Sequence, residues 1–265
     1  MKMKNEKKTV LITGACINTG VDIVEKFASE GYRVLFTGRS IERVLAAEKA
    51  YRAKFPDAEI KGYRLDALTD DGEVDENSVK ELFVELDKQE IFVDTLVLNA
   101  ADQGLGAKLF ENPLSDFTKV LNTNVVWNFV LSEQAAMRMK EHGGGNIVFV
   151  NSNTAYRAIP DRVAYVASKG GQLGLMRALA LDLGKYKIRV NAVLPGMIVT
   201  DRWEKNPEFY ANVPSRFTPL GEVAVGADVA DAVYYFAACA NNTTGAELVV
   251  DGGNTIQLYP IIPRQ

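Results

Sequence analysis

Apolar and polar positions follow two distinct patterns along the chain. Short aliphatic and β-branched runs, several of them apolar almost throughout, predict strands that are covered on both faces. They lie at 9–13, 33–37, 59–65, 95–98, 146–151, 189–193 and 247–250. Longer stretches with helical character separate them, at 20–30, 41–55, 76–88, 114–140, 164–184 and 228–240. Seven strands with intervening helices predict a doubly wound α/β fold, with a parallel sheet and helices on both faces.

Two segments stand apart from this regular pattern. Residues 197–220 are rich in proline and aromatic side chains and lack clear periodicity, which favours a substrate lid. Residues 255–265 carry Pro260 and Pro263, which exclude a continuous helix. We therefore expect one Rossmann-type domain over residues 1–265, a lid, and an extended apolar tail that packs against a neighbouring subunit. A monomeric mass in solution would contradict the last expectation.

Composition excludes several classes of function. The chain has 24% charged residues and a net charge of −4 without a basic face, so nucleic acid is not an expected partner. No apolar run approaches the ~18 residues of a membrane span, and no signal peptide is evident, so we expect a cytoplasmic protein that binds no membrane. His142 is the only histidine, and Cys16 and Cys239 are isolated. This pattern argues against a Ser-His-Asp triad, a metal site and a disulfide framework.

The turn TGACINTG at 13–20 joins the first predicted strand to the first predicted helix. A cofactor phosphate needs backbone N–H groups at a helix N-terminus with no side chain in the way, which Gly14 and Gly20 can provide. The turn between them is expected to require a positive φ angle, which asparagine tolerates better than most residues, so Asn18 can stand there. A tight strand-to-helix turn without a ligand is the alternative interpretation.

Tyr165 and Lys169, in the sequence YVASK, lie four residues apart on a predicted helix and therefore share one face. Free tyrosine titrates near pH 10, and a nearby ammonium group should lower that pKa toward neutrality. Tyr165 could then give a proton to a carbonyl oxygen or take one from an alcohol. An exposed pair with no catalytic role is the alternative.

Taken together with further motifs in order, these residues resemble the classical short-chain dehydrogenase/reductase family. The turn at 13–20 is similar to the family's T-G-x-x-x-G-x-G, with Asn18 in place of the middle glycine. LNAA at 98–101, RVNAVLPG at 189–196 and VDGG at 250–253 resemble three further family segments. The similarity spans roughly residues 8–254. It implies a Rossmann-type domain with the cofactor across the C-terminal ends of the strands.

The resemblance implies a catalytic set of Asn124, Ser152, Tyr165 and Lys169. Ser152 stands thirteen residues before Tyr165, which is the family's spacing, and would polarise and position the substrate oxygen. Asn124 would hold a water in a proton relay behind Lys169. A mid-helix asparagine also has poor helix propensity and needs a reason. Asn122 is the competing candidate, although the register favours Asn124. Lys169 would also hydrogen-bond the nicotinamide ribose.

The end of the second predicted strand bears on the choice of cofactor. Relatives that prefer NAD carry a carboxylate about 20 residues beyond the glycines. Thr37 takes that place here, and Arg39 and Ser40 follow as donors for a 2′-phosphate. Ile17 stands where many NADP-dependent relatives carry a basic residue, and Arg39 could instead be a solvated charge. The site favours NADP, with NAD as the alternative.

The resemblance also implies the remaining cofactor contacts. They are Gly14, Asn18, Thr19, Gly20, Asp66, Asn99, Ala100, Pro195, Gly196, Ile198 and Thr200, together with Arg39, Ser40, Tyr165 and Lys169. We therefore predict an NADP(H)-dependent oxidoreductase that transfers hydride between nicotinamide and a carbonyl or secondary alcohol, with Tyr165 as acid/base. An NAD-dependent sugar, polyol or steroid alcohol dehydrogenase is one alternative. A dinucleotide-binding sensor without turnover is the other.

Three segments are expected to select a small-molecule substrate: 102–109, 153–162 and the lid. Arg157 and Arg162 lie between Ser152 and Tyr165, so one of them could meet an anionic group. Solvation or pairing within an interface is the more ordinary explanation for both. The resemblance implies a homodimer or homotetramer that forms through the helices at 114–140 and 164–184.

Overall fold

The computed structural model describes residues 7–105, 109–111, 114–200, 203 and 205–261, without the side chains of residues 209 and 215. Parts of two predicted substrate segments, at 106–108 and at 201, 202 and 204, lie outside the described residues. The end of the predicted tail, 262–265, also lies outside them.

A parallel sheet of seven strands forms the centre of the protein, in the order β3-β2-β1-β4-β5-β6-β7. The strands are β1 Thr9–Ile12, β2 Arg33–Gly38, β3 Ile60–Arg64, β4 Thr95–Leu98, β5 Gly145–Val150, β6 Ile188–Pro195 and β7 Glu247–Val250. Each corresponds to one of the seven predicted runs. The predicted doubly wound fold is therefore confirmed.

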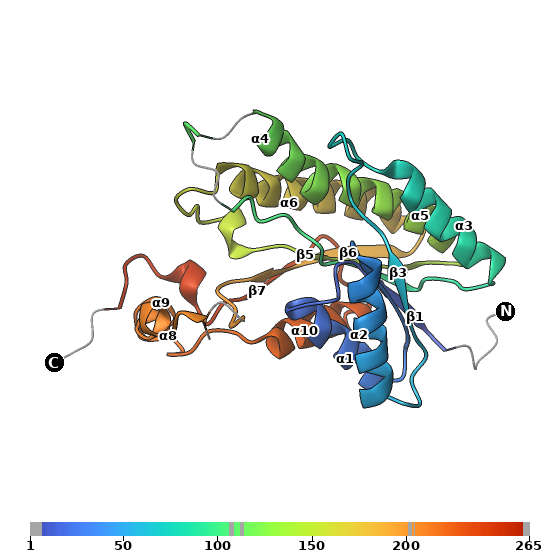
Figure 1. The fold of residues 1–265 in the computed structure, drawn as a ribbon, viewed down its shortest axis with the longest axis horizontal. Helices are drawn as coiled ribbons and strands as arrows, with labels where there is room; N and C mark the ends of the chain where they lie inside the picture. Colours follow the sequence, from blue (N-terminus) through green and yellow to red (C-terminus); the bar gives the residue numbers. More distant parts are fainter. Residues whose placement is uncertain (1–6, 106–108, 112–113, 201–202, 204, 262–265) are drawn as a thin grey trace.

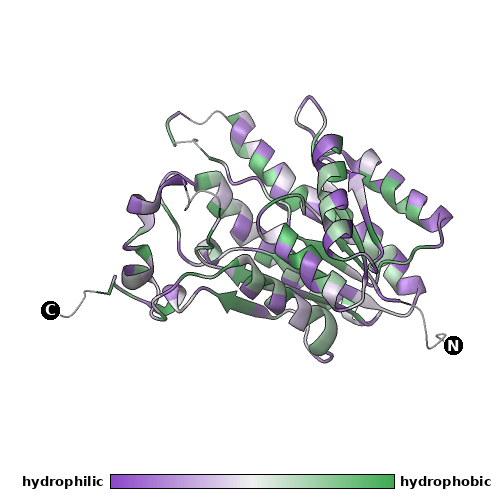
Figure 2. Cartoon of the chain, turned by 60° about the horizontal axis from the view of Figure 1, so that its bottom comes forward, coloured by the Kyte–Doolittle hydropathy of each residue, from purple (hydrophilic) through white to green (hydrophobic). Residues whose placement is uncertain are grey.

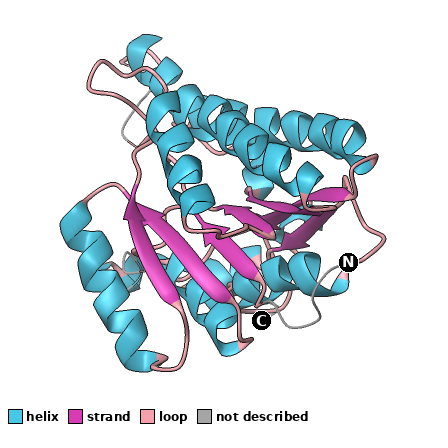
Figure 3. Ribbon diagram, turned by 90° about the vertical axis from the view of Figure 1, so that its right-hand side faces the viewer, coloured by secondary structure: helices cyan, strands magenta, loops and turns pink. Residues whose placement is uncertain are grey.

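Helices cover both faces of the sheet (Figure 1). One layer contains α1 Thr19–Ser29, α2 Ile41–Lys54 and α10 Gly226–Tyr234. The other contains α3 Glu76–Lys88, α4 Leu114–Leu121, α5 Trp127–Glu141 and α6 Val163–Gly184. Figure 3 shows the same sheet from the side, between its two helical layers.

Side chains alternate between the two faces along each strand, which explains why both helical layers pack against the sheet. On β1, Val10 and Ile12 pack with α1 and α10, whereas Leu11 packs with α3, α5 and α6 on the opposite face. Apolar residues line the strands throughout the interior, as the hydropathy colouring of Figure 2 shows. Burial of one such aliphatic side chain contributes about 1.5–3 kcal/mol, so apolar packing holds a helical layer on each face of the sheet.

Two predicted helices are interrupted by π-helical segments. The stretch at 114–140 contains η1 Asn122–Val126 between α4 and α5, and the stretch at 228–240 ends in η3 Tyr235–Cys239 after α10. A π turn inserts one extra residue and is frequently found at functional sites. Prediction of a single α-helix over 114–140 was therefore wrong in one respect, since the helical path changes register around Asn124.

The strand order places a crevice at the C-terminal edge of the sheet. β1 pairs with β2 on one side and with β4 on the other, so the chain path reverses direction across the sheet between β1 and β4. In open α/β sheets such a switch point is where ligands bind, beyond the carboxyl ends of the strands. The residues that follow β1, β2, β4 and β5 are consequently brought to one place.

The lid and the tail are in contact within the chain. The lid contains two short helices, α8 Pro207–Tyr210 and α9 Val213–Phe217, and each has a proline in its first turn. After β7, a short helix η4 Asn254–Ile256 leads into an extended tail. The side chain of Gln257 and the backbone N–H of Ile261 both donate to the Arg216 carbonyl, at 2.9 and 2.8 Å. Packing of the tail against a neighbouring subunit stays a prediction.

Within the described part of the chain, we find no helix that combines the length and the apolar character needed to cross a membrane.

Candidate active site

The turn after β1 is held tightly against the segment after β4. The Thr13 hydroxyl accepts the backbone N–H groups of Asn99 and Ala100, at 3.0 and 3.1 Å. The Asn99 side chain in turn donates to the carbonyls of Thr13 and Gly14, at 3.0 and 3.1 Å. Two predicted cofactor contacts, Asn99 and Ala100, therefore lie directly beside the predicted phosphate turn.

Close backbone approach explains both glycines of this turn. A Cβ atom on Gly14, which has a φ of 65°, would lie 2.7 Å from the Cβ of Ala100. A Cβ atom on Gly20 would lie 2.6 Å from the Cα of Ala15. These positions leave backbone N–H groups at the start of α1, with Thr19 as its first residue, and no side chain on the glycines to cover them. Such a cradle fits the pyrophosphate of a dinucleotide.

Asn18 has φ 51° and ψ −144°, which confirms the expected positive φ. Its side chain is exposed and makes no capping hydrogen bond to α1. This backbone region is occupied almost only by glycine, and a residue held there costs about 1–3 kcal/mol. Asn18 is therefore a strained substitute for the family's glycine.

Asn18→Gly is expected to raise the free energy of unfolding by about 1 kcal/mol, because relief of strain outweighs the greater freedom of glycine in the unfolded chain. Urea denaturation measures the change. Asn18→Ala is the matched control and is expected to lose stability, since alanine tolerates a positive φ less well than asparagine. A glycine variant less stable than the wild type would show that the Asn18 side chain is needed.

The strand tip that was expected to select the cofactor lies one residue further on than predicted. Thr37 lies inside β2 with a buried side chain, and its hydroxyl accepts the backbone N–H of Gly14 at 3.4 Å. It cannot face a ribose, so its assignment to the cofactor-selecting position was wrong. The last residue of β2 is Gly38, where an added Cβ would lie 2.4 Å from the Cys16 sulfur. A carboxylate at this tip would require Cys16 to move.

Three arginines surround the strand tip. Arg39 follows Gly38 and is exposed, and its carbonyl accepts a hydrogen bond from the Arg64 guanidinium at 3.2 Å. The positive charge of Arg43 acts on the neighbouring Cys16 thiol. It partly offsets the rise in the pKa of Cys16 that burial causes.

Ser40 caps the start of α2. Its hydroxyl accepts the backbone N–H of Arg43 at 3.4 Å and donates to Glu42. The local charge is therefore predominantly positive.

The predicted reacting groups meet at the other side of the same edge. Ser152 follows β5, and Tyr165 and Lys169 lie in the first two turns of α6. Ser152 is hydrogen-bonded to Tyr165. The Lys169 nitrogen lies 5.6 Å from the centroid of the Tyr165 ring and donates to the Val150 carbonyl at 3.1 Å. Lys169 is 1% exposed, which is exceptional for a lysine side chain.

The electrostatics of this centre differ from the expectation. Burial raises the pKa of Tyr165, and the hydrogen bond with Ser152 and the positive charge of Arg162 offset only part of that rise. Burial also lowers the pKa of Lys169 to about 7. The expectation that the Lys169 ammonium lowers the pKa of Tyr165 was therefore wrong, because the cation is itself desolvated and loses much of its charge near neutrality.

Asn124 lies behind the lysine, in the π-helical segment η1, and is fully buried. Its side chain accepts from the backbone N–H of Asp102 at 2.7 Å and donates to the Asp102 carbonyl at 2.8 Å. It also donates to the Ser168 hydroxyl at 2.9 Å. The competing candidate Asn122 points elsewhere and donates to the Gly72 carbonyl at 3.2 Å. Between the two, the structure brings Asn124 to the site.

The remaining predicted cofactor residues lie around the same edge. Asp66 follows β3 and accepts the backbone N–H of Ala67 at 2.8 Å. Pro195 ends β6, and Gly196 lies so close to β7 that an added Cβ would be 2.5 Å from the Cβ of Asp251. Ile198 and Thr200 follow at the start of the lid, where Ile198 bridges to Ala224 and the Thr200 carbonyl accepts the backbone N–H of Trp203.

The two arginines considered for an anionic substrate group have partners in the protein. Arg157 donates to the Gln257 carbonyl in the tail, and Arg162 donates to the carbonyl of Asp161 at 3.0 Å. The segment after β4 approaches the centre as well, since an added Cβ on Gly104 would lie 4.0 Å from the Cβ of Tyr165. The loop after β4 therefore lies beside Tyr165.

Sequence reasoning missed two buried amides at this centre. Gln172 accepts from Lys169 at 3.1 Å and from Asn151 at 2.9 Å. The Asn151 side-chain oxygen also accepts the backbone N–H of Ser152, at 2.7 Å. The sequence could have indicated Gln172, because this residue lies three positions after Lys169 on the same helical face, in an otherwise apolar stretch.

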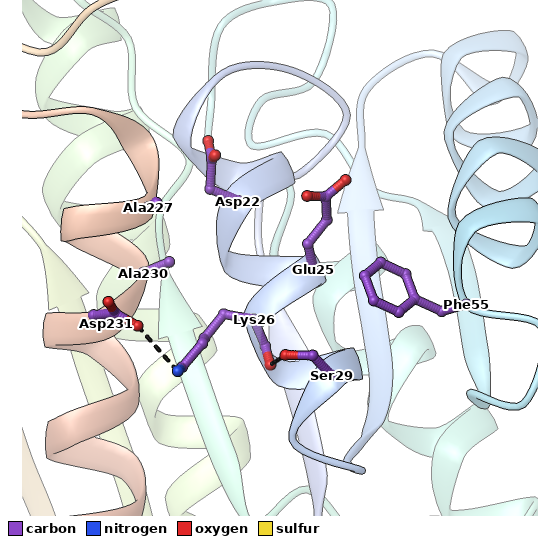
Figure 4. A pocket seen from close by; sticks show the side chains of 8 residues that line it. All are labelled: Asp22, Glu25, Lys26, Ser29, Phe55, Ala227, Ala230 and Asp231. Atoms are coloured by element: carbon purple, nitrogen blue, oxygen red, sulfur yellow. Dashed lines mark hydrogen bonds and ion pairs between the residues drawn. The ribbon is translucent and has the colours of Figure 1, made fainter.

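A groove on the opposite helical layer is a separate feature. It lies beside α1 and α10 and is lined by Asp22, Lys26 and Asp231, among others (Figure 4). Lys26 pairs with both Asp231 and Glu30 at 3.0 Å, so the charges pair with each other. Across the described residues, we find no group of three or more side chains that could hold a metal ion.

The arrangement can hold a dinucleotide and move a proton. Backbone N–H groups stand at the start of α1 and arginines at the tip of β2, which suits a phosphorylated cofactor. A phenol, a hydroxyl and an amine converge after β5, at the place where a carbonyl oxygen can accept a proton.

Comparison with known proteins agrees with this geometry. A family model described as enoyl-(acyl carrier protein) reductase matches residues 14–255. The 3α-hydroxysteroid dehydrogenase of Mediterraneibacter gnavus is 34% identical over 95% of this chain and 98% of its own. The 3-oxoacyl-[acyl-carrier-protein] reductase MabA of Mycobacterium bovis is 29% identical, over 93% of this chain and 92% of its own.

Solved structures resemble the whole fold. ElxO with NADP bound has a TM-score of 0.85 and 31% identity, and the match covers 95% of this chain and 100% of that one. A 7α-hydroxysteroid dehydrogenase in complex with NADH and 7-oxo glycochenodeoxycholic acid has a TM-score of 0.83 and 29% identity, with 95% of each chain covered.

Proposed function

This chain belongs to the classical short-chain dehydrogenase/reductase family, and from that premise we propose that it transfers hydride between NADP(H) and a carbonyl or secondary alcohol. It is an NAD(P)-dependent enzyme that acts on CH–OH groups, as its named relatives are. The observation that carries the proposal is the convergence of Ser152, Tyr165 and Lys169 at the C-terminal edge of the sheet, the same edge that carries the glycine turn.

In the proposed mechanism, the bound nicotinamide supplies or accepts the hydride. Ser152 holds the substrate oxygen, and the Tyr165 hydroxyl gives that oxygen its proton during reduction. Burial raises the pKa of Tyr165, so the phenol keeps its proton at neutral pH until the substrate oxygen takes it. Lys169 and Asn124 act behind the phenol.

Two features of the β2 tip support NADP over NAD. Arg39, Arg43 and Arg64 supply positive charge where the 2′-phosphate of NADP would lie, and planar guanidinium groups bind phosphate in a bidentate manner. Gly38 stands at the tip, where a carboxylate would hold the ribose of NAD, and Cys16 fills the space that its side chain would need. ElxO was solved with NADP and the 7α-hydroxysteroid dehydrogenase with NADH, so both cofactors occur among structural neighbours.

Arg39→Ala is expected to raise the KM for NADPH about 10- to 100-fold, since hydrogen bonds between charged groups are worth about 1.5–3 kcal/mol each. The KM for NADH should stay within about twofold of the wild type, because NADH lacks the phosphate. Initial rates with the two cofactors measure both values. Lys49→Ala is the control, since it removes the same charge from an exposed position further along α2. Equal losses with both cofactors would contradict the 2′-phosphate role of Arg39.

The substrate class is tested by a panel. NADPH absorbance is monitored across ketones, 3-oxo thioesters, keto-sugars and oxo-steroids, and the same panel is repeated with NADH. Relatives named for steroids, glucose and 3-oxoacyl groups make each of these classes a reasonable candidate. A sugar, polyol or steroid alcohol dehydrogenase with a preference for NAD is the second candidate. Binding of NADPH without turnover of any carbonyl would favour a dinucleotide sensor.

We also propose an oligomer for this chain. The outer faces of α5 and α6 expose apolar side chains that include Phe129, Met137 and Leu181, and Leu181 is 84% exposed. Such residues suit the helical faces through which a homodimer or homotetramer would form. We further propose that the chain forms one domain with a lid and a tail and that the protein is located in the cytoplasm.

A further inference from the structure

Gln172 connects three elements behind the reacting groups. It lies on α6 and is 1% exposed. Its side-chain oxygen accepts from the Lys169 ammonium at 3.1 Å and from the Asn151 side chain at 2.9 Å. Its side-chain nitrogen donates to the Asn124 carbonyl at 2.6 Å. One buried amide therefore joins the lysine to β5 and to the π-helical segment η1.

The Asn124 carbonyl has a second side-chain donor. The amide of Asn128 reaches it from the following turn at 2.9 Å. Two amide side chains therefore donate to this one carbonyl oxygen. Gln172 links that oxygen directly to Lys169.

We propose that Gln172 is a positioning residue that holds Lys169 through a direct amide bridge to the Asn124 carbonyl. The inference rests on the proposed function and deepens it. A carboxamide accepts on oxygen and donates from nitrogen, so this one side chain bonds to the lysine and to the carbonyl at the same time.

The surroundings of Lys169 make it sensitive to Gln172. The groups around its nitrogen are the Val150 carbonyl from β5, the Gln172 oxygen and the Tyr165 ring from its own helix. Tyr165 is the titratable group among them, and burial is the cause of the lowered pKa of Lys169. An acceptor that bonds to the charged form favours that form, so loss of Gln172 should lower this pKa further.

Three variants test the bridge by NMR titration of Lys169 in protein labelled with ¹³C at the lysine Cε, without cofactor or substrate. The Lys169 signal is assigned by its loss in Lys169→Met. Gln172→Leu is expected to lower the titration midpoint by about one pH unit or more, because a charge-assisted hydrogen bond is lost. Gln172→Glu should raise the midpoint above that of the wild type, since the retained acceptor is now charged. Asn128→Leu, which removes the other donor to Asn124 without touching Lys169, should leave it unchanged.

Each outcome separates this inference from the proposed function. An unchanged midpoint in Gln172→Leu overturns the positioning role, and Gln172→Glu decides in the same titration if the leucine variant does not fold. The titration needs no turnover, so it stands even if no carbonyl is reduced. Failure of the proposed function is measured independently with Tyr165→Phe.

Discussion

Tyr165→Phe is expected to lower kcat for carbonyl reduction by about 10²–10⁴-fold, which is the range that a positioned general acid contributes. Phenylalanine keeps the ring and the packing of α6 but has no proton to give. The dissociation constant for NADPH should stay within about threefold of the wild type, since the glycine turn and the β2 tip are untouched. Stopped-flow turnover and fluorescence titration of NADPH measure the two quantities.

Tyr186→Phe provides the control for this experiment. Tyr186 follows the end of the same helix, far along α6 from Ser152, and its replacement should leave kcat unchanged. Undiminished activity in Tyr165→Phe would mean that another group protonates the substrate oxygen. The assignment of Ser152 and Lys169 would then also have to be withdrawn.

Lys169→Met is expected to abolish measurable turnover. It should also change the free energy of unfolding, by an amount that depends on pH. The pKa of Lys169 is lowered from 10.5 to about 7 by burial. Between those values the unfolded chain binds a proton that the folded chain does not, so folded-state stability rises with pH over that window. The destabilisation is fully present below about pH 7 and is relieved above about pH 10.5.

The size of the effect follows from two opposing contributions. The burial cost of the charged lysine is roughly 3–5 kcal/mol below neutrality. Methionine removes that cost but leaves the Val150 carbonyl and the Gln172 oxygen without this donor, which costs about 1–3 kcal/mol for each group. The two contributions nearly cancel at pH 6, so we expect Lys169→Met to be about as stable as the wild type there and less stable by roughly 2–6 kcal/mol at pH 10, where the wild type no longer carries the burial cost.

Urea denaturation at pH 6 and at pH 10 measures this difference. Lys185→Met is the control, because Lys185 is exposed at the end of α6 and its replacement should change stability by less than about 0.5 kcal/mol at either pH. A variant that is destabilised equally at both pH values would show that Lys169 carries no burial cost. The lysine would then be an ordinary ion in the folded protein.

The sheet could be predicted from the sequence because the same pattern of apolar and polar residues recurs from strand to strand. Most of the strands contain aliphatic runs bounded by polar residues, and their alternation with helices leaves few topologies. The positive φ of Asn18 could also be predicted, since the turn between Gly14 and Gly20 must reverse sharply within a few residues. These features depend on local pattern and backbone geometry.

Other features depended on distances that sequence does not give. The β2 tip shifted from Thr37 to Gly38 because one extra ladder residue, paired with Arg64, extends the strand. The π segment around Asn124 changes the helical register by one residue, which the apolar pattern of 114–140 is too coarse to reveal. The pKa values of Tyr165 and Lys169 follow from burial, which becomes visible only when β5, α6 and η1 are placed together. Gln172 was overlooked for the same reason.

The contact between the tail and the lid has a practical consequence for handling the protein. Gln257 and Ile261 are bound to the backbone of Arg216, so a fusion close behind this contact would disturb the segment that would cover a substrate. β1 begins at Thr9, at the amino edge of the sheet, whereas the reacting groups lie at the opposite edge. Affinity tags and immobilisation chemistry therefore belong before β1, where they leave the approach of ligands undisturbed.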